Sequence, residues 1–111
     1  MTRPLRVRVV VPCHDEAARL DVDAFESFAA KQPHVRFLLV DDGSNDATLD
    51  VLSGLAARRP SSFEVLALTP NRGKGEAVRA GLRAAMRGDV DVVGYWDADL
   101  ATPLDMVPVF H

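Results

Sequence analysis

The sequence predicts an α/β fold: a Rossmann-like parallel sheet with helices on both faces. The first observation is that short apolar runs typical of strands alternate with amphipathic stretches typical of helices. The second is that the connections between apolar runs are too long for hairpins, which favours parallel strands joined by helical crossovers. The third is that a polar cluster follows each apolar run. In such a sheet these clusters meet at one edge, where ligands bind.

The first strand is predicted at residues 7–11, where four of the five side chains are valine and Pro12 follows. Such a run favours burial on both faces, as in a parallel sheet. A helix is predicted over Asp23–Lys31, with Asp23 as its N-cap and Pro33 beyond its end. Its buried face would hold Phe25, Phe28 and Ala29.

The second strand is predicted at Val35–Val40 and is broken by the polar turn at residues 41–44. Asp46 would cap the next helix, which Pro60 closes. This helix would turn three leucines toward the sheet: Leu49, Leu52 and Leu55.

The third strand is predicted at Phe63–Leu68, before a glycine-rich loop and a helix over Glu76–Arg87. Gly88 would be the C-terminal cap of that helix. The inward face of the helix would hold Val78, Leu82, Ala85 and Met86.

The fourth strand, predicted at Val90–Trp96, delivers two carboxylates to the binding edge, with Tyr95 and Trp96 as core and support. Asp97 and Asp99 are two residues apart, which in an extended chain is about 6.6 Å on one face. Two such carboxylates can share a divalent cation, and oxygen ligands suit Mg²⁺ or Mn²⁺. The alternative is a pair of solvated loop aspartates.

Length and composition indicate one domain over residues 1–111, with a formal net charge of −3. This balance gives the whole chain no attraction for nucleic acid, which we exclude as a partner, or for an anionic membrane. Cys13 is the single cysteine, so an internal disulfide is impossible, which fits a cytoplasmic location. No apolar run reaches the length of about 18 residues that a membrane span needs.

Two loops contain candidate binding groups, each with a structural alternative. Asp42 could accept a hydrogen bond from an imide N–H such as that of uracil, or could cap the next helix together with Asp41. Lys74 lies in the stretch Arg72–Gly75, which lacks the spacing of a P-loop but still favours an anion site before a helix. The alternative there is a turn that begins a helix and carries solvated cations.

Histidine and arginine give weaker signals. His14 offers a flat ring that could pack on a base, or is an ordinary loop histidine, and no spacing typical of zinc is present. Arg79, Arg83 and Arg87 recur at helical spacing and form one stripe, to which the pattern assigns no site.

Taken in order, four motifs resemble the family 2 glycosyltransferases of the GT-A fold, and most closely the polyprenyl-phosphate and dolichyl-phosphate glucosyltransferase group. The resemblance covers nearly the whole chain. The motifs are Val9–Glu16, Leu39–Thr48, Asn71–Gly81 and Asp97–Pro103. Two positions depart from the family pattern, since His14 stands where Tyr or Phe is usual and Asp15 where Asn is common.

The resemblance implies a donor site for a nucleoside-diphosphate sugar such as UDP-glucose. Pro12, His14, Glu16, Asp42 and Ala98 would contact the nucleotide, and Lys74 would lie near the phosphates. The pair Asp97 and Asp99 would have the DxD role, with catalytic contacts to ribose, metal and pyrophosphate. The implied reaction is inverting transfer to an acceptor such as polyprenyl phosphate, at the cytoplasmic face of the membrane in the full-length protein.

Such enzymes continue well past residue 111, so the chain corresponds to the donor half of a transferase. We therefore expect nucleotide binding without transfer, and exposed apolar surface that favours a homo-oligomer or the missing C-terminal half as partner. Two other interpretations stay open: a catalytically silent nucleotide-binding module, and a receiver-like signalling domain. A receiver would need an aspartate after the third strand, where residues 68–70 are Leu, Thr and Pro.

Overall fold

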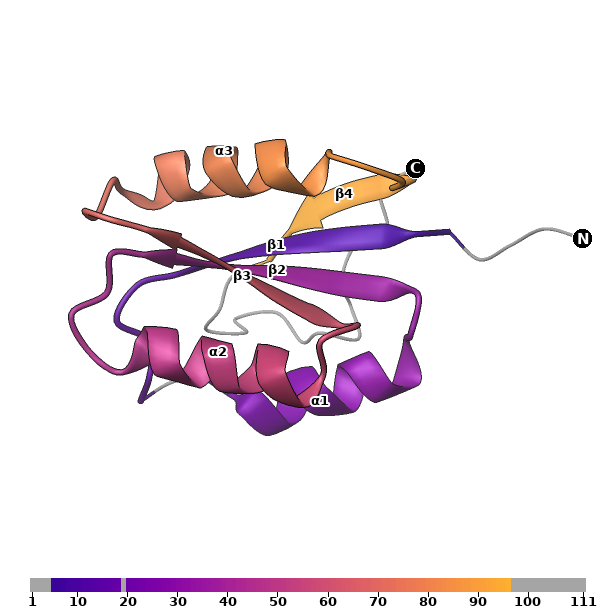
Figure 1. The fold of residues 1–111 in the computed structure, drawn as a ribbon, viewed down its shortest axis with the longest axis horizontal. Helices are drawn as coiled ribbons and strands as arrows, with labels where there is room; N and C mark the ends of the chain where they lie inside the picture. The colour runs from indigo at the N-terminus through magenta and orange to yellow at the C-terminus, as the bar shows by residue number, and fades with distance from the viewer. Residues whose placement is uncertain (1–4, 19, 97–111) are drawn as a thin grey trace, which may run out of the picture.

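The structure, a computed structural model, describes residues 5–18 and 20–96. These residues form a parallel four-stranded sheet of order β3-β2-β1-β4, with α3 on one face and α1 and α2 on the other (Figure 1). The elements are β1 (Val7–Cys13), α1 (Val22–Lys31), β2 (Val35–Asp42), α2 (Thr48–Arg58), β3 (Phe63–Leu68), α3 (Lys74–Ala85) and β4 (Val92–Tyr95). The predicted parallel α/β fold is confirmed.

β1 is central in the sheet because its valines are buried on both faces. Val9 and Val11 pack with Phe37 and other residues on the side of α1 and α2, whereas Val10 packs with Val40 on the side of α3. Burying an aliphatic side chain contributes about 1.5–3 kcal/mol. The valine run therefore stabilises both layers of the fold at once.

Aromatic rings fill the layer between the sheet and α1. Phe25 of α1 meets Phe37 of β2 edge to face, with ring centroids 5.5 Å apart, and Phe37 stacks on Phe63 of β3 at 5.4 Å. Each such pair contributes about 0.5–1.5 kcal/mol beyond area burial. The predicted inward face of α1 is confirmed, with Phe25 and Ala29 buried and Phe28 half-buried.

On the other face, α3 approaches the sheet through small side chains. Ala77, Gly81 and Ala85 are its buried residues. A Cβ atom on Gly81 would overlap Cγ1 of Val10 and lie 2.9 Å from Cγ2 of Val40. The axis of α3 therefore lies closer to the strands than larger residues would permit.

The bounds, the C-cap and the buried face predicted for α3 were partly wrong. The helix begins at Lys74, two residues before Glu76, and ends at Ala85 with Met86, and not Gly88, as its C-cap. Met86 is 62% exposed and not inward-facing. Side-chain size misled the prediction, because close packing against the sheet selects small residues over large ones.

The two other helix starts also differ from prediction. The N-cap of α1 is Asp21, whose Oδ1 accepts the N–H of Ala24 at 3.0 Å, so Asp23 lies in the first turn instead. Asp46 precedes α2 by two residues and accepts the N–H of Thr48 at 2.9 Å.

The buried faces of α2 and β4 differ from prediction at two positions. Leu52 and Leu55 point into the core as predicted, but Leu49 is exposed and Thr48 is buried in its place. β4 is shorter than predicted: Trp96 is buried in the core, whereas Tyr95 is exposed. Among the described residues, no helix is long and apolar enough to cross a membrane.

Candidate functional site

The carboxyl ends of the strands meet at one edge of the sheet, at the left of Figure 1. In the strand register, Cys13 of β1 pairs with Asp41 of β2, and Asp42 pairs with Leu68 of β3. The loops that follow these strands are therefore neighbours. The first three polar clusters of the sequence do converge, as predicted.

Asp42 joins two of these loops. Its Oδ1 accepts the backbone N–H of Arg72 at 2.8 Å, and its Oδ2 accepts a proton of Asn71 Nδ2 at 3.3 Å. Asp42 is only 2% exposed, so both bonds form in a low-dielectric environment that strengthens them. Asp42 makes no cap on α2, so the capping alternative was wrong.

Gly43 permits the close approach of the same loops. It has φ of +63°, and a Cβ atom there would overlap the backbone N of Asn71 and lie 2.9 Å from its Cα. A left-handed φ with no space for a side chain requires glycine. Positions 42 and 43 thus hold the β3–α3 loop by hydrogen bonds and by contact.

His14 lies against this junction. Its Nδ1 is 2.9 Å from the carbonyl O of Asp42 and its Nε2 is 3.3 Å from Oδ2 of Asp15. Asn71 Nδ2 donates to the same Asp42 carbonyl at 3.0 Å, so the ring and the amide share one acceptor. The imidazole is fixed in orientation while 43% of its side chain stays exposed. One face of the ring can therefore meet a ligand.

Asp15 supports His14 through an unusual backbone. Its φ of +50° is rare for a non-glycine residue, although aspartate tolerates it better than most. Its Oδ1 accepts the N–H of Asn45 at 2.8 Å, and its own N–H donates to Oγ of Ser44 at 3.0 Å. The loops after β1 and β2 are thereby joined.

Thr48 connects the β1 loop to the start of α2. Its Oγ1 accepts the N–H of Glu16 at 2.8 Å and that of Ala17 at 3.1 Å, and its hydroxyl donates to Oδ1 of Asp46. This hydroxyl is the main cause that lowers the pKa of Asp46, against opposing desolvation and with smaller help from backbone N–H groups. Glu16 is thereby held in place through its backbone N–H.

A buried acidic corner lies on the α1 and α2 side of the edge. Asp41 is 3% exposed, and its Oδ1 has no hydrogen-bond partner among the described residues. Burial raises the pKa of Cys13 to about 12, and the charges of Glu16 and Asp41 add to the shift. A buried acceptor without a donor costs about 1–3 kcal/mol, so Asp41 Oδ1 is a position where an N–H donor would bind favourably.

The other predicted residues lie as follows. Pro12 is buried in β1, opposite Val40. Lys74 is exposed at the first position of α3, directly after Gly73, which has φ of +91°.

Asp97, Ala98 and Asp99 lie outside the described residues, which end at Trp96. The N–H of Trp96 donates to the carbonyl O of Val10 at 2.9 Å. Within residues 5–18 and 20–96, no group of three or more His, Cys, Asp and Glu is arranged to hold a metal.

Sequence reasoning missed two residues of this edge. Asp41 was considered only as a helix cap, yet alternation along β2 places it on the opposite face from Asp42, beside Cys13. That alternation was the available signal. Asn71 was seen only as part of a polar cluster, because its contacts to His14 and Asp42 join residues far apart in sequence.

The model of the family described as glycosyl transferase family 2 matches residues 8–110. The chain belongs to glycosyl transferase family 2. This membership makes it a transferase by family and excludes the receiver-like alternative. The family 2 motifs of β1, β2 and the β3–α3 loop are the ones that build the edge described above.

Curated relatives in the family are similar over most of this chain. An undecaprenyl-phosphate 4-deoxy-4-formamido-L-arabinose transferase of Shewanella sediminis is 31% identical over 92% of the chain. A dolichyl-phosphate beta-glucosyltransferase of Drosophila melanogaster is 38% identical over 73% of it. The chain spans only 31% and 28% of these two relatives, so it corresponds to less than a third of their length.

Solved structures place the fold among the GT-A glycosyltransferases. A mannosyltransferase of Pyrobaculum calidifontis, in complex with GDP-Man and Mn²⁺, superposes with a TM-score of 0.72 at 27% identity over 88% of this chain and 28% of its own. TarS of S. aureus in complex with UDP-GlcNAc gives 0.67 at 22% identity, covering 86% of this chain and 27% of TarS. The second likeness supports the fold alone.

Proposed function

We propose that this family 2 chain is the donor-binding part of a sugar transferase that binds a nucleoside-diphosphate sugar, such as UDP-glucose, at the carboxyl edge of the sheet. Pro12, His14, Glu16 and Asp42 line the nucleoside position. Lys74 lies toward the phosphates, at the N-terminus of α3, where a helix favours anions. Asp97 and Ala98 complete the nucleotide contacts.

The observation that carries this proposal is the buried Oδ1 of Asp41, which has no hydrogen-bond partner among the described residues. Uracil and guanine each present an imide-type N–H, whereas adenine and cytosine do not. An imide donor would satisfy the buried carboxylate oxygen and orient the base beside His14. The carboxylate of Asp42, the acceptor expected from the sequence, accepts the N–H of Arg72 and an amide proton of Asn71, which supports Asp41 for the imide contact and Asp42 for the adjoining wall of the nucleoside position.

The transfer reaction breaks the bond between the anomeric carbon and the diphosphate oxygen, which takes the electron pair. An oxygen of an acceptor such as polyprenyl phosphate forms the new bond from the opposite face, which inverts the configuration. A phosphate monoester with a second pKa near about 6 is already ionised at pH 7, so little help from a base is needed. Lys74 stabilises the diphosphate charge that develops.

A divalent cation, Mg²⁺ or Mn²⁺, fits this edge, since its side chains supply carboxylate oxygens, the ligands that both ions prefer. Asp97 and Asp99 would hold it. When bound, it would neutralise charge on the departing diphosphate. A solved family neighbour binds Mn²⁺ together with GDP-Man, which supports the same choice of ion.

We further propose that the acceptor part of the enzyme lies beyond this segment, either in a C-terminal half or in a second copy, and that the full-length protein works at the cytoplasmic face of the membrane. Near-attack geometry requires both substrates to be held, an advantage worth about 7–11 kcal/mol when complete. The 111-residue chain alone should therefore bind a nucleotide sugar and transfer nothing measurable. It would then behave as the silent binding module.

Titration calorimetry with uridine and 3-methyluridine tests the base assignment, because methylation removes the imide N–H. Wild type should bind uridine about tenfold or more tightly than 3-methyluridine. Asp41→Leu should abolish this discrimination and stay folded, since it removes a buried charge. Asp50→Leu, at an exposed position of α2, is the matched control and should retain it.

Equal affinity of wild type for the two nucleosides would contradict the role of Asp41. Radiolabelled glucosyl lipid formed by the purified chain, and lost in Asp97→Asn, would show instead that 111 residues make a complete enzyme.

A further inference from the structure

The outer surface of α3 differs in charge from the rest of the molecule. Between residues 72 and 87 the sequence has five cations and a single carboxylate, Glu76, for a net charge of +4. The five cations are Arg72, Lys74, Arg79, Arg83 and Arg87. Because the whole chain carries −3, everything outside this segment sums to −7. The net charge of this segment is therefore opposite in sign to that of the remaining sequence.

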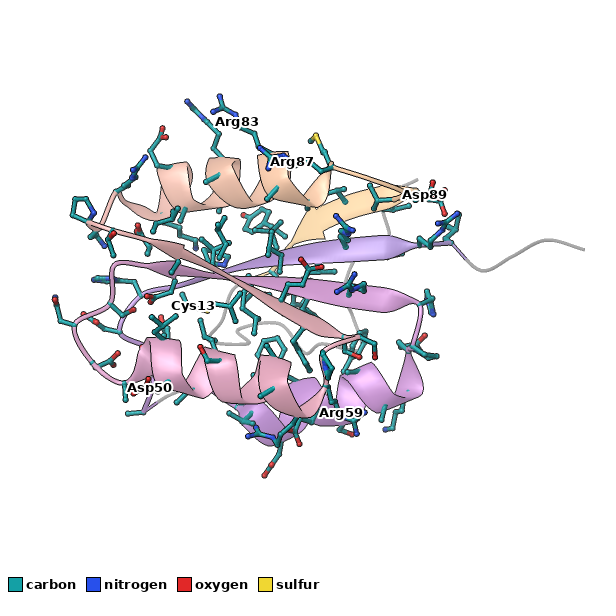
Figure 2. All side chains as sticks on the ribbon, in the orientation of Figure 1. Cys13, Asp50, Arg59, Arg83, Arg87 and Asp89 are labelled. Carbon is teal, nitrogen blue, oxygen red and sulfur yellow. The ribbon has the colours of Figure 1, made fainter. Side chains whose placement is uncertain are left out.

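The cations face solvent because the opposite side of α3 is fixed on the sheet by Gly81. Arg79 and Arg83 lie about one turn apart on α3, roughly 6 Å along its axis, and Arg87 follows two residues after the helix ends. Figure 2 shows Arg83 and Arg87 projecting from α3 on the side away from the strands. We call Arg79, Arg83, Met86 and Arg87 the α3 basic face.

Two of these guanidinium groups lack any internal role among the described residues. Glu76 pairs with Arg79 at 3.3 Å, whereas Arg83 and Arg87 make no ion pair or hydrogen bond through their side chains within residues 5–18 and 20–96. The last carbonyls of the helix are already served by Arg8, whose Nη1 donates to Ala85 O at 3.1 Å and to Arg87 O at 2.8 Å. Capping therefore does not account for the stripe.

An apolar side chain accompanies the charges. Met86 is 62% exposed and lies within about 60° of Arg83 around the helix axis. Clustered basic side chains are attracted to the negative potential of anionic lipid headgroups, and an exposed methionine adds an apolar contact. A cavity of about 410 Å³ lies elsewhere in the molecule, lined by residues such as Arg6, His34 and Arg36.

We propose that the α3 basic face docks on an anionic lipid surface. Charge complementarity selects this occupant, because exposed arginines, two of them without an ion pair among the described residues, fit a flat, diffuse layer of phosphate groups. The orientation rests on the proposed function: α3 begins at Lys74 on the donor edge, so a helix lying on the bilayer would hold that edge beside a lipid-phosphate acceptor. Because the remaining sequence has a net charge of −7, the α3 basic face is the part of the chain that anionic lipid would attract.

Vesicle co-sedimentation tests the proposal, with phosphatidylcholine vesicles that contain or lack phosphatidylglycerol and no nucleotide present. Wild type should bind only the anionic vesicles and dissociate as salt screens the charges. R83A/R87A should lower the partition coefficient about 25-fold, at roughly fivefold for each arginine. R83K/R87K should retain binding.

The matched control is K31A/R59A, which removes the same charge from the opposite side of the sheet and should bind as wild type does. Arg59 lies on that side in Figure 2. Equal binding to neutral and anionic vesicles, or equal losses in the two alanine pairs, would overturn the proposal. Binding to polyglutamate but not to vesicles would assign the face to an acidic protein, and an R83A/R87A change in sedimentation without vesicles would assign it to a second copy.

Calorimetry with UDP on the same variants separates this inference from the donor site. Vesicle binding without UDP binding would support the α3 basic face as a lipid-binding surface and contradict the proposed function. UDP binding without vesicle binding would support the proposed function and contradict the lipid-binding role. Unaltered thermal melting of R83A/R87A would exclude loss of helix stability as the cause of weaker binding.

Discussion

Gly81 of α3 lies directly against Val10 of β1, so that a Cβ atom on the glycine would overlap Cγ1 of the valine. Gly81→Ala should lower the free energy of unfolding by about 1–2 kcal/mol, because overpacking costs more than the better helix propensity of alanine returns. Urea denaturation measures this. Val10→Ala should reduce the cost of Gly81→Ala when the two are combined. Gly75→Ala, with no atom within 4 Å of the new Cβ, should be neutral or stabilising.

Asp42 should matter for stability as well as for binding. Asp42→Ala leaves the N–H of Arg72 and the amide of Asn71 without their carboxylate acceptor, at an expected cost of about 1–3 kcal/mol in urea denaturation. Asp42→Ala should also weaken the binding of uridine, with or without metal. Asp50→Ala is the matched control and should cost much less. Unchanged stability and unchanged uridine affinity would remove Asp42 from both roles.

The hydrogen bond between Thr48 and Asp46 should make the stability of the fold depend on pH in the acid range. Because the pKa of Asp46 lies below its ordinary value of 3.8 in the folded state, the carboxylate stabilises the fold above that pH. The contribution is lost as pH falls through the folded pKa. Thr48→Val should raise the pKa of Asp46 in an NMR titration, whereas Thr48→Ser should preserve it. A pKa that does not move would contradict the role of the hydroxyl.

Thr48→Val should also cost about 1–3 kcal/mol of stability at neutral pH, since the N–H groups of Glu16 and Ala17 lose their acceptor. Thr48→Ser retains that acceptor and should stay close to wild type in the same denaturation experiment.

Cys13 should be inert while the chain is folded. Burial raises its pKa to about 12 from 9.0, so the thiol stays protonated and shielded at pH 8, and a disulfide reagent should react only as fast as the chain unfolds. The unfolded chain alone loses this proton above pH 9, so the contribution of Cys13 to stability falls between about pH 9 and 12. Comparison with Cys13→Ala isolates that slope. Rapid labelling in the native state would refute this.

Asp99 should be required for metal-dependent binding. Asp99→Asn should abolish the enhancement of UDP-sugar affinity by Mg²⁺ or Mn²⁺ and leave the melting temperature unchanged, because it replaces one polar side chain by a neutral one of the same size. Titration calorimetry with and without metal measures the difference, and Asp50→Asn is the control. Metal-dependent affinity equal to wild type would defeat the DxD assignment.

The order of strands and helices could be predicted because runs such as residues 7–11 are apolar at every buried position and the connections are too long for hairpins. The packing of α3 could not, since hydrophobicity alone ranks Met86 above Gly81 as a core residue. Likewise, His14 and Asp42 were predicted as binding positions from their place after strands. That the ring of His14 meets the carbonyl of Asp42 depends on how separate loops meet, which local sequence does not encode.

The contact between Gly43 and Asn71 has a consequence for how this protein can be engineered. The two loops are in close contact because residue 43 has no side chain, so the energetic effects of substitutions in them are expected to be coupled. Many substitutions should destabilise the protein when made in one loop alone and be tolerated when both loops change. A library that varies residues 42–44 alone would mostly collect unstable proteins, whatever donor it was selected for. Varying residues 42–44 and 70–72 together should give a larger yield of folded variants with altered nucleotide preference.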